Sequence, residues 1–368
     1  MKHVLFVDDE PKILQAMKRI LFPLAEAWKM TFVESGEAAL EALAATPYDV
    51  LITDMRMPGM DGAELLAHTA ERYPSVARFV LSGQAGVEAI LRAVPVTHQF
   101  LAKPCEPSVL RELVERACGL QDLLGNSRVR EAVGKVRELP SRPKVYGALA
   151  RAVADPRTSS KDVAEIVEQD MAMCAKILQL ANSAFFGLRH PVSNIQGAVV
   201  QIGTAMLQNL VLSCEVRQAF VSANGVLSLD TEQEHALRAA TLARGLVTDR
   251  QKRDDAFMAA MLHDVGKLVL ATQMTEEFRA AVAKARQDRV PLHEVEPGVY
   301  GVSHAEVGGY LLGLWGLPYP IVEAVARHHA PWRAVSEEAV DLADAVFLAE
   351  GLAQEQAAAS APRQDLPN

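Results

Sequence analysis

The stretch VLITDMRMPGMDG at residues 50–62 combines a short strand signal with a tight turn directly after it. The apolar run 50–52 is short and contains β-branched residues, so it predicts a buried strand rather than a helix. Asp54 follows at the carboxyl end of this run, and the Pro-Gly and Asp-Gly pairs predict the turn. In open parallel sheets, reactive groups collect at the carboxyl ends of the strands. Asp54 is therefore the first candidate functional residue.

Three further apolar runs end in polar side chains of complementary chemistry. Residues 3–7 precede Asp8-Asp9-Glu10, residues 79–81 precede Ser82, and residues 99–102 precede Lys103. Carboxylates that meet at one sheet edge repel each other unless a hard cation such as Mg²⁺ neutralises them. With a hydroxyl and an ammonium beside it, such a site suits phosphoryl transfer to an aspartate. The plainer alternative is an acidic cluster that only solvates a loop.

The order of elements predicts two different architectures in one chain. Residues 1–106 alternate short apolar runs with helical stretches at 12–21, 36–45 and 63–71. This alternation predicts an α/β doubly wound parallel sheet. From residue 107 onward the strand signal fades, and the pattern predicts an all-α region.

In motif order and spacing, residues 1 to about 120 resemble the receiver domain of two-component response regulators, which has a flavodoxin-like fold. The motifs are DD at 8–9, DMRMPGMDG at 54–62, Ser82 and Lys103-Pro104. The resemblance implies that a sensor histidine kinase phosphorylates Asp54. It also implies the other site residues: Asp8, Asp9, Asp54 and the backbone carbonyl of Arg56 for Mg²⁺, Ser82 and Lys103 for the phosphoryl oxygens, and Ser82 and Phe100 for the conformational switch.

The segment after the receiver-like part leaves two interpretations open. Ser108 stands where an N-cap belongs, and an apolar seam follows at Leu110, Leu113, Ala117, Leu120 and Leu124. After an interruption at 125–127, Val129, Val133 and Val136 resume the stripe. The seam is either the receiver's last helix, packed on its own sheet and followed by a linker helix at 121–138, or a signalling helix that forms a homodimer.

The composition is that of an ordinary globular protein. The 368 residues suffice for two or three domains, and a net charge of −9 argues against a broad nucleic-acid surface. No apolar run approaches the roughly twenty residues of a membrane span, and no signal-peptide pattern precedes the first strand. We therefore expect a cytoplasmic protein. Helices are expected after a Ser159 cap, at 170–180 and at 202–219, and residues 351–368 are expected to form a disordered tail.

Histidines and aspartates recur on separate helical stretches of the second half. They are His235, His263, Asp264, His304, His328, His329 and Asp344. Each one alone has an ordinary explanation as a core or surface residue. Brought together from separate helices, imidazole and carboxylate groups are a usual way to bind one or two divalent metals in a helical bundle. Lys267, one turn after His263, would then face a phosphate near the metals.

This pattern resembles the HD superfamily of metal-dependent phosphohydrolases, and more closely its HDOD branch, over residues 139 to about 345. The stretches that carry the HDOD resemblance are LPSRP at 139–143, QDMAMCAKILQLANSAFFG at 169–187, IQGAVVQIG at 195–203, HALRAATLARGL at 235–246, AAMLHDVGKLVL at 259–270 and HAEVGGYLLGLWGLP at 304–318. The resemblance implies an all-helical HDOD output domain at 139–350. Such domains transmit signals to a protein or nucleotide partner, often with an incomplete HD site.

The metal-ligand positions of the HD enzymes are well retained in this sequence, but their substrate-side signature is not. His235, His263, Asp264 and Asp344 match the four basic ligand positions, and His304, His328 and His329 match the extra histidines of the HD-GYP cyclic-dinucleotide phosphodiesterases. The GYP signature is absent, since HHAPWR stands at 328–333, and Thr231 occupies the place of a further ligand. A divalent transition metal in this domain, and a phosphodiesterase activity, stay open as alternatives to a non-catalytic output. A DNA-binding output is the weakest alternative, because residues 162–184 fit the HDOD core and lack a run of Arg and Lys.

Overall fold

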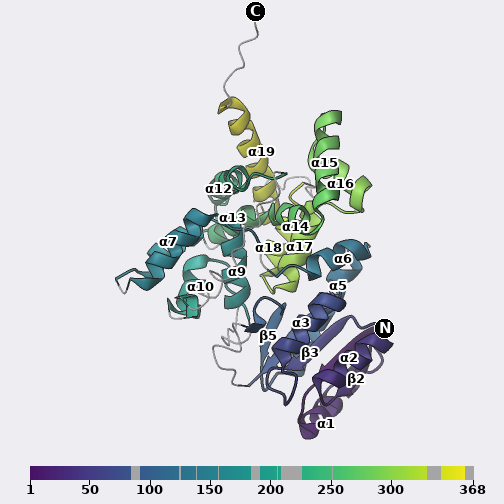
Figure 1. Cartoon of the computed structure of the whole chain (residues 1–368). Helices are drawn as coiled ribbons and strands as arrows, with labels where there is room; N and C mark the ends of the chain where they lie inside the picture. Colours follow the sequence, from purple (N-terminus) through teal and green to yellow (C-terminus); the bar gives the residue numbers. More distant parts are fainter. Residues whose placement is uncertain are drawn as a thin grey trace, which may run out of the picture.

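A computed structural model describes residues 1–83, 92–123, 126–137, 139–155, 157–183, 191–204, 206–208, 226–250, 252–329 and 341–360. Figure 1 shows a sheet with its covering helices at one end of the molecule and a larger body of helices at the other. Helices α5 and α6 lie between the two. Among the helices in these ranges, none is both long and apolar enough to cross a membrane.

The sheet is parallel, with strand order β2-β1-β3-β4-β5. This is the flavodoxin-like order and confirms the predicted doubly wound fold. Its strands are β1 (Lys2–Val7), β2 (Trp28–Val33), β3 (Val50–Asp54), β4 (Ala77–Ser82) and β5 (Gln99–Ala102). Every residue of β3 and β4 is buried, because helices cover both faces of a parallel sheet. The edge strand β2 was not predicted, since it is only partly buried and carries the polar residues Lys29 and Thr31.

Three helices around the sheet match the predicted stretches: α1 (Pro11–Ile20), α2 (Gly36–Ala45) and α3 (Gly62–Arg72). Helix α5 (Pro107–Leu123) begins one residue before Ser108, so the N-cap expected at Ser108 is wrong, and a short 3₁₀ turn η1 (Phe22–Leu24) was not predicted. Local caps explain where two of them begin. The Ser35 side chain accepts a hydrogen bond from the backbone N of Ala38, and Asp61 accepts one from Glu64.

Every described element after β5 is a helix, as predicted. Beyond α5 these are α6 (Ser127–Gly134), α7 (Pro143–Ala154), α8 (Ser160–Val167), α9 (Met171–Ala181), α10 (Ile195–Ile202), α12 (Leu229–Leu246), α13 (Arg253–Leu262), α14 (Val265–Gln273), α15 (Thr275–Asp288), α16 (Leu292–Tyr300), α17 (His304–Leu314), α18 (Tyr319–Ala326) and α19 (Leu342–Ser360). The Ser159 cap is confirmed as a capping box with Asp162. Most of the helix expected at 202–219 lies outside the described residues.

The expected tail differs in its first part. Helix α19 continues to Ser360, whereas disorder was expected from residue 351. The physical reason is composition, because residues 353–359 consist of Ala, Gln and Glu, which are good helix formers. Residues 361–368 lie outside the described ranges.

The apolar seam of α5 is buried within the chain. Leu110, Leu113 and Ala117 are buried, while Leu124 lies outside the described residues. Leu120 packs so closely on α17 that a Cβ on Gly313 would lie 2.4 Å from its Cδ1. Val129, Val133 and Val136 in and after α6 are buried too. The seam therefore packs within this chain, between β3 of the sheet and α17 of the helical body, and the homodimer stays a prediction.

Polar contacts join the sheet domain (β1 to α5) to the helical body. A guanidinium N–H of the buried Arg78 donates to the backbone carbonyl of Gly134 over 2.7 Å. The amide of Gln99 on β5 donates to the carbonyl of Leu314, the last residue of α17, over 2.9 Å. On α9, Gln179 donates to the carbonyl of Thr97 over 3.2 Å. The two parts thus meet along β4, β5 and α5.

Candidate functional site

The predicted residues of the sheet domain do meet at the carboxyl edge of the sheet. We call Asp8, Asp54, Ser82 and Lys103 the strand-edge site. Asp54 and Ser82 are the last residues of β3 and β4, and Asp8 and Lys103 directly follow β1 and β5. Asp8, Asp54 and Ser82 are almost fully buried, with exposed fractions of 2%, 9% and 9%.

Lys103 pairs with both buried carboxylates. Its Nζ lies 2.7 Å from Asp8 Oδ2 and also donates to Asp54 Oδ1. Burial alone would lower the pKa of Lys103, but the hydrogen bonds and charges of Asp54 and Asp8 raise it above its ordinary value. The ammonium therefore neutralises the acidic edge from inside the protein.

The backbone around Asp54 is held closely. The backbone N of Arg56 donates to Asp54 Oδ2 over 2.6 Å. Gly62 begins α3 directly above the strand end, where a Cβ would lie 2.1 Å from the carbonyl oxygen of Asp54. Only glycine allows this close approach, which explains the Asp-Gly pair of the motif.

The residues present fit a magnesium ion. Asp8 and Asp54 share Lys103 as a partner, so their carboxylates face one place, and the half-exposed Asp9 follows Asp8. Carboxylate oxygens are the ligands that Mg²⁺ prefers. Phe100, the predicted switch residue, lies in β5 and is 4% exposed. The contacts of Lys103 bring Asp8 and Asp54 together, and Ser82 ends the neighbouring strand β4, while the acceptor, metal and switch roles stay predictions.

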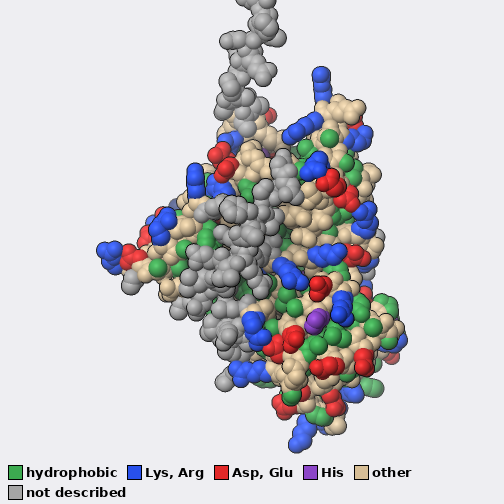
Figure 2. All heavy atoms as spheres, viewed as in Figure 1, with side chains coloured by type: hydrophobic (Ala, Val, Ile, Leu, Met, Phe, Trp, Pro, Cys, Tyr) green, Lys and Arg blue, Asp and Glu red, His purple; other side chains and the backbone are tan. Residues whose placement is uncertain are grey.

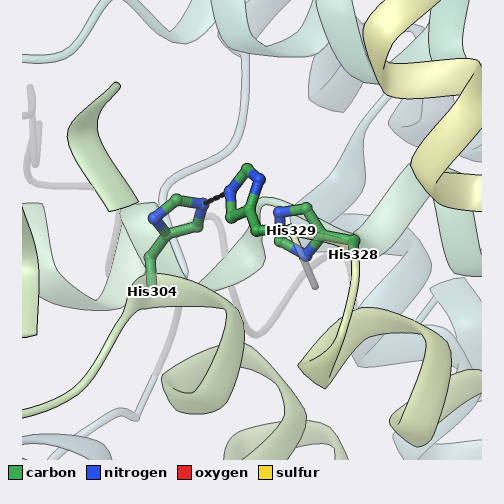
Figure 3. Close-up of side chains that lie close together, drawn as sticks. All are labelled: His304, His328 and His329. Carbon is green, nitrogen blue, oxygen red and sulfur yellow. Dashed lines mark hydrogen bonds between the residues drawn. The ribbon is translucent and has the colours of Figure 1, made fainter. Parts of the chain in front are cut away.

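In the helical body, a second cluster gathers side chains from five separate segments. His235 lies on α12, His263 and Asp264 lie between α13 and α14, His304 begins α17, and His328 and His329 follow α18. Glu350 joins them from α19. We call these seven residues the histidine cluster. Figure 3 shows how His304, His328 and His329 turn toward one another.

Asp264 lies at the centre of the histidine cluster. Its Oδ2 is 3.1 Å from His263 Nε2 and 3.9 Å from His235 Nε2. Its Oδ1 is 3.1 Å from His304 Nε2 and 3.7 Å from His328 Nε2. One carboxylate therefore faces two groups of imidazoles, one on each oxygen.

Three overlapping sets within the cluster have the spacing of metal ligands. They are His235, His263 and Asp264; His263, His328 and Glu350; and His304, His328 and His329. In each set the candidate ligand atoms lie within 4.8 Å of one another. Six of the seven predicted ligands thus come together.

The seventh predicted ligand, Asp344, belongs to none of these sets within the described residues. Glu350, which sequence reasoning missed, is the carboxylate of α19 that belongs to one of the sets. Glu350 Oε2 lies 3.7 Å from His328 Nε2 and 3.6 Å from His329 Nδ1. Six residues along a helix rotate a side chain by roughly 240°, so the two carboxylates project in different directions. The available signal was Glu350 as the single charged residue in the apolar run 345–353.

Lys267 also reaches the cluster. Its Nζ lies 2.6 Å from Asp264 Oδ2 and 3.4 Å from Glu232 Oε2. Burial acts to lower the pKa of Lys267, but Asp264 and Glu232 raise it above its ordinary value. Thr231 is exposed and its hydroxyl donates to Ser228, so its neighbour Glu232 supplies the carboxylate at this end of α12.

Buried polar atoms in the cluster lack partners. Among the described residues, His263 Nε2, His328 Nε2 and Asp264 Oδ1 have no partner in good hydrogen-bond geometry, although Asp264 lies 3.1 Å from both His263 and His304. Leaving such atoms unpaired is costly, and a divalent cation would satisfy all three. Burial, together with the neighbouring histidines, lowers the pKa of His235 to about 4 and that of His329 to about 2. Neutral imidazoles are the form that binds metal, so the donor set fits a transition metal.

His304 and His263 both have a raised pKa in the absence of metal. Burial acts to lower the pKa of each ring, but Asp264 and Glu296 outweigh that effect and raise the pKa of His304 to about 9, while Asp264 raises that of His263. A metal at Nε2 takes the place of the proton there, so metal binding and protonation of these rings compete. Burial likewise acts to raise the pKa of Asp264, but the charges of His263 and Lys267 hold it well below its usual range. The cluster thus combines an ionised carboxylate with neutral and charged imidazoles.

Comparison with known proteins matches both halves of the chain. The family model described as HDOD domain matches residues 139–331, and the model described as response regulator receiver domain matches residues 4–115. Among solved structures, the MmoQ response regulator of Methylococcus capsulatus str. Bath has a TM-score of 0.52 and 24% sequence identity. That match covers 61% of this chain and 90% of MmoQ, and at this identity it shows a shared fold.

The curated relatives match only parts of the chain. An uncharacterized protein of Treponema pallidum (strain Nichols) is 29% identical over 203 residues, which is 53% of this chain and 38% of that protein. The DNA-binding transcriptional regulator NtrC of Escherichia coli (strain K12) is 35% identical over 112 residues, which is 30% of this chain and 24% of NtrC. The chain therefore spans well under half the length of these relatives.

Proposed function

Because the chain belongs to the HDOD family and is a response regulator with a receiver domain ahead of its HDOD output domain, we propose that phosphorylation of Asp54 controls that output. The observation that carries the proposal is the pairing of Lys103 with Asp8 and Asp54 at one sheet edge. A phosphoryl group on Asp54 would offer Lys103 a stronger partner. The ammonium would then leave its present position, and the receiver would shift toward a second conformation.

In this proposal the chemistry is transfer of a phosphoryl group from the cognate histidine kinase. The Asp54 carboxylate attacks phosphorus, the phosphorus–nitrogen bond of the kinase phosphohistidine breaks, and an acyl phosphate forms. Mg²⁺, when bound by Asp8, Asp9 and the carbonyl of Arg56, offsets the charge of the carboxylates and the phosphoryl group. Lys103 and Ser82 take the phosphoryl oxygens, and Phe100 responds to the movement of Ser82.

The test is phosphate uptake by the intact chain. Wild-type protein and Asp54→Ala are incubated with a small phosphodonor and Mg²⁺, and intact mass is measured. We expect one phosphate on wild type and none on the variant. Equal uptake by both proteins would refute the assignment of Asp54.

For the output domain we propose a non-catalytic HDOD module that binds a protein or nucleotide partner. Support comes from the motifs at 139–318 and from the sequence HHAPWR where the HD-GYP enzymes carry their substrate-side signature. A specific observation favours a second candidate, a metal-dependent phosphohydrolase. It is the histidine cluster, with its buried and unpartnered ligand atoms and with Lys267 beside Asp264.

Metal analysis separates a metal-binding cluster from one that only packs. We expect a divalent transition metal to co-purify with wild type and to be absent after the double change His263→Ala and Asp264→Ala. Metal that binds only the native state also raises thermal stability. If metal is present, assays on cyclic dinucleotides and simple phosphodiesters, with Lys267→Ala as control, distinguish an enzyme from a metal-binding module. No metal and no stabilisation by Mn²⁺, Fe²⁺, Zn²⁺ or Mg²⁺ would refute the second candidate.

A further inference from the structure

Helix α16 (Leu292–Tyr300) forms one wall of the histidine cluster. It packs against α15 and α17, and Figure 1 shows α15 and α16 projecting together from the helical body. Its residue Glu296 is completely buried, with an exposed fraction of 0%. Carboxylates are almost never fully buried unless a partner compensates them. The partner of Glu296 therefore indicates what the residue does.

That partner is His304. Glu296 Oε2 accepts a hydrogen bond from the backbone N of His304 over 2.8 Å and lies 2.7 Å from its ring Nδ1. The other ring nitrogen, Nε2, then faces Asp264 Oδ1 at 3.1 Å and His329 Nε2 at 2.9 Å. The dashed line in Figure 3 marks the contact between His304 and His329. A single carboxylate thus holds both the backbone and the ring of this histidine.

Two other histidines of the cluster obtain the same orientation without a carboxylate. His263 Nδ1 lies 2.6 Å from the carbonyl oxygen of Ala260, and His328 Nδ1 lies 2.7 Å from that of Val325. In both cases the acceptor is the backbone three residues earlier, and Nε2 points into the cluster. His304 is the first residue of α17, so no preceding helical turn offers it such a carbonyl. Glu296 supplies the missing acceptor from another helix.

A second contact ties the same helix to the cluster. The ring of His293, one turn before Glu296, stacks on His329 with centroids 3.8 Å apart and planes at 17°. Helix α16 therefore contacts two neighbouring members of one ligand set, His304 through Glu296 and His329 through His293. Sequence reasoning named neither residue of α16.

We propose that Glu296 is a positioning residue of the metal site, which keeps the proton of His304 on Nδ1 and leaves Nε2 free for the metal. The inference rests on the metal-binding function proposed above. Hydrogen bonds from a ligand histidine to a carboxylate fix the tautomer and the ring orientation, and loss of such a partner typically weakens metal binding about 10- to 100-fold. Glu296 does not touch the metal in this assignment.

The test compares metal affinity in Glu296→Ala, Glu296→Gln and a matched control, Glu294→Ala. Glu294 lies on the same helix but is exposed, so its removal should leave the cluster intact. Zn²⁺ affinity is measured by competition with a chromophoric chelator. We expect Glu296→Ala to lose about 10- to 100-fold, Glu296→Gln to lose less because its amide oxygen still accepts from Nδ1, and Glu294→Ala to match wild type.

A second readout reports on the proton itself. Zn²⁺-loaded wild-type protein with ¹⁵N-labelled histidine should show a downfield Nδ1–H resonance from His304. The loss of this resonance in His304→Gln assigns it. It should disappear in Glu296→Ala and move upfield in Glu296→Gln, where the hydrogen bond to a neutral amide is weaker. If Glu296→Ala fails to fold, Glu296→Gln alone carries the test.

The outcomes distinguish the positioning role of Glu296 from the metal-binding function on which it rests. Wild-type affinity and an unchanged His304 resonance in the Glu296 variants would overturn the positioning role while leaving the metal site in place. Absence of Zn²⁺ uptake by wild type would overturn the metal-binding function, and the positioning role with it.

Discussion

In the proposed mechanism, Lys103 links the phosphorylation of Asp54 to the conformation of the receiver. Its ammonium is shared between Asp8 and Asp54, so it both neutralises the resting site and is available to a phosphoryl group. We expect Lys103→Ala to accept phosphate, because Asp54 is retained, but to lose the conformational response. Intact mass reports the uptake, and hydrogen exchange of the phosphorylated protein reports the response. A wild-type response in the variant would show that Lys103 does not transmit the signal.

The same change should alter the resting stability. Without the ammonium, two buried carboxylates lose the charge that neutralises them and keep only backbone hydrogen bonds, so we expect the unphosphorylated variant to lose about 1–3 kcal/mol of stability. Added Mg²⁺ should restore part of that loss. Lys12→Ala is the matched control, because Lys12 is an exposed lysine of the same domain.

The structure favours Glu350 over Asp344 as a metal ligand, which the sequence did not predict. Glu350 lies in a ligand set and Asp344 does not, although both are acidic residues of α19. We expect Glu350→Gln to lower the metal content of purified protein, because a neutral amide is a weaker ligand for a divalent metal. Asp344→Asn should retain the wild-type content. The reverse result would return Asp344 to the ligand set.

At the scale of elements, α6 is fitted closely against the sheet domain. A Cβ on Gly134, its last residue, would lie 1.7 Å from the carbonyl oxygen of Pro74. Gly134→Ala should therefore force the two apart and lower the free energy of unfolding by about 1–3 kcal/mol. Gly119 on α5 is the matched control, because a Cβ there meets no other atom within 4 Å.

Thermal unfolding of the two alanine variants checks this contact. Gly119→Ala should be as stable as wild type or up to about 1 kcal/mol more stable, since alanine favours a helix. If both variants were equally stable, the close contact between α6 and Pro74 would not exist in solution.

Strand β2 could not be predicted, because an edge strand with polar residues carries a weak sequence signal.

At the scale of the whole molecule, α17 runs from the histidine cluster to the start of β5, the strand that precedes Lys103. His304 at the start of α17 belongs to the histidine cluster, and Leu314 at its end accepts a hydrogen bond from Gln99 of β5. Its packing is close, since a Cβ on Gly266 of α14 would lie 1.9 Å from the carbonyl oxygen of His304. A shift of the receiver at β5 should therefore move the cluster.

We expect a phosphoryl mimic on Asp54 to change the Mn²⁺ affinity of the histidine cluster. Affinity is measured with and without beryllofluoride at one fixed Mg²⁺ concentration, with Asp54→Ala as control. Couplings of this kind typically amount to about 5- to 150-fold, and Mn²⁺ must change the affinity for the mimic by the same factor. Gln99→Ala should reduce the factor. Equal Mn²⁺ affinity in both states would show that the sites are independent.

The charge of the whole molecule agrees with the expectation from composition. On the face shown in Figure 2, acidic and basic side chains are interspersed over both parts of the chain. With a net charge of −9, this mixture gives no support to a DNA-binding output.

The sequence by itself determined the features that depend on residues close together along the chain. Asp54, Ser82 and Lys103 follow directly after strand signals, and parallel strands bring their carboxyl ends to one edge, so this meeting could be predicted. Caps such as Ser159 and the switch from strands to helices are local as well. Most histidines of the cluster were identified because their motifs are short and continuous.

Only the tertiary structure decided which face of each later helix turns toward the cluster. In helix α19 the buried residues Ala345, Val346, Ala349 and Ala353 share one face, but the apolar Phe347 and Leu352 lie off it and are exposed, so the apolar pattern alone does not distinguish Glu350 from Asp344. Glu296 and His293 reach the cluster because α16 folds back beside α17. Gln99 and Leu314 are 215 residues apart in sequence and meet only when the two parts pack together. Such contacts depend on how whole helices pack, and this is information that no short stretch of sequence contains.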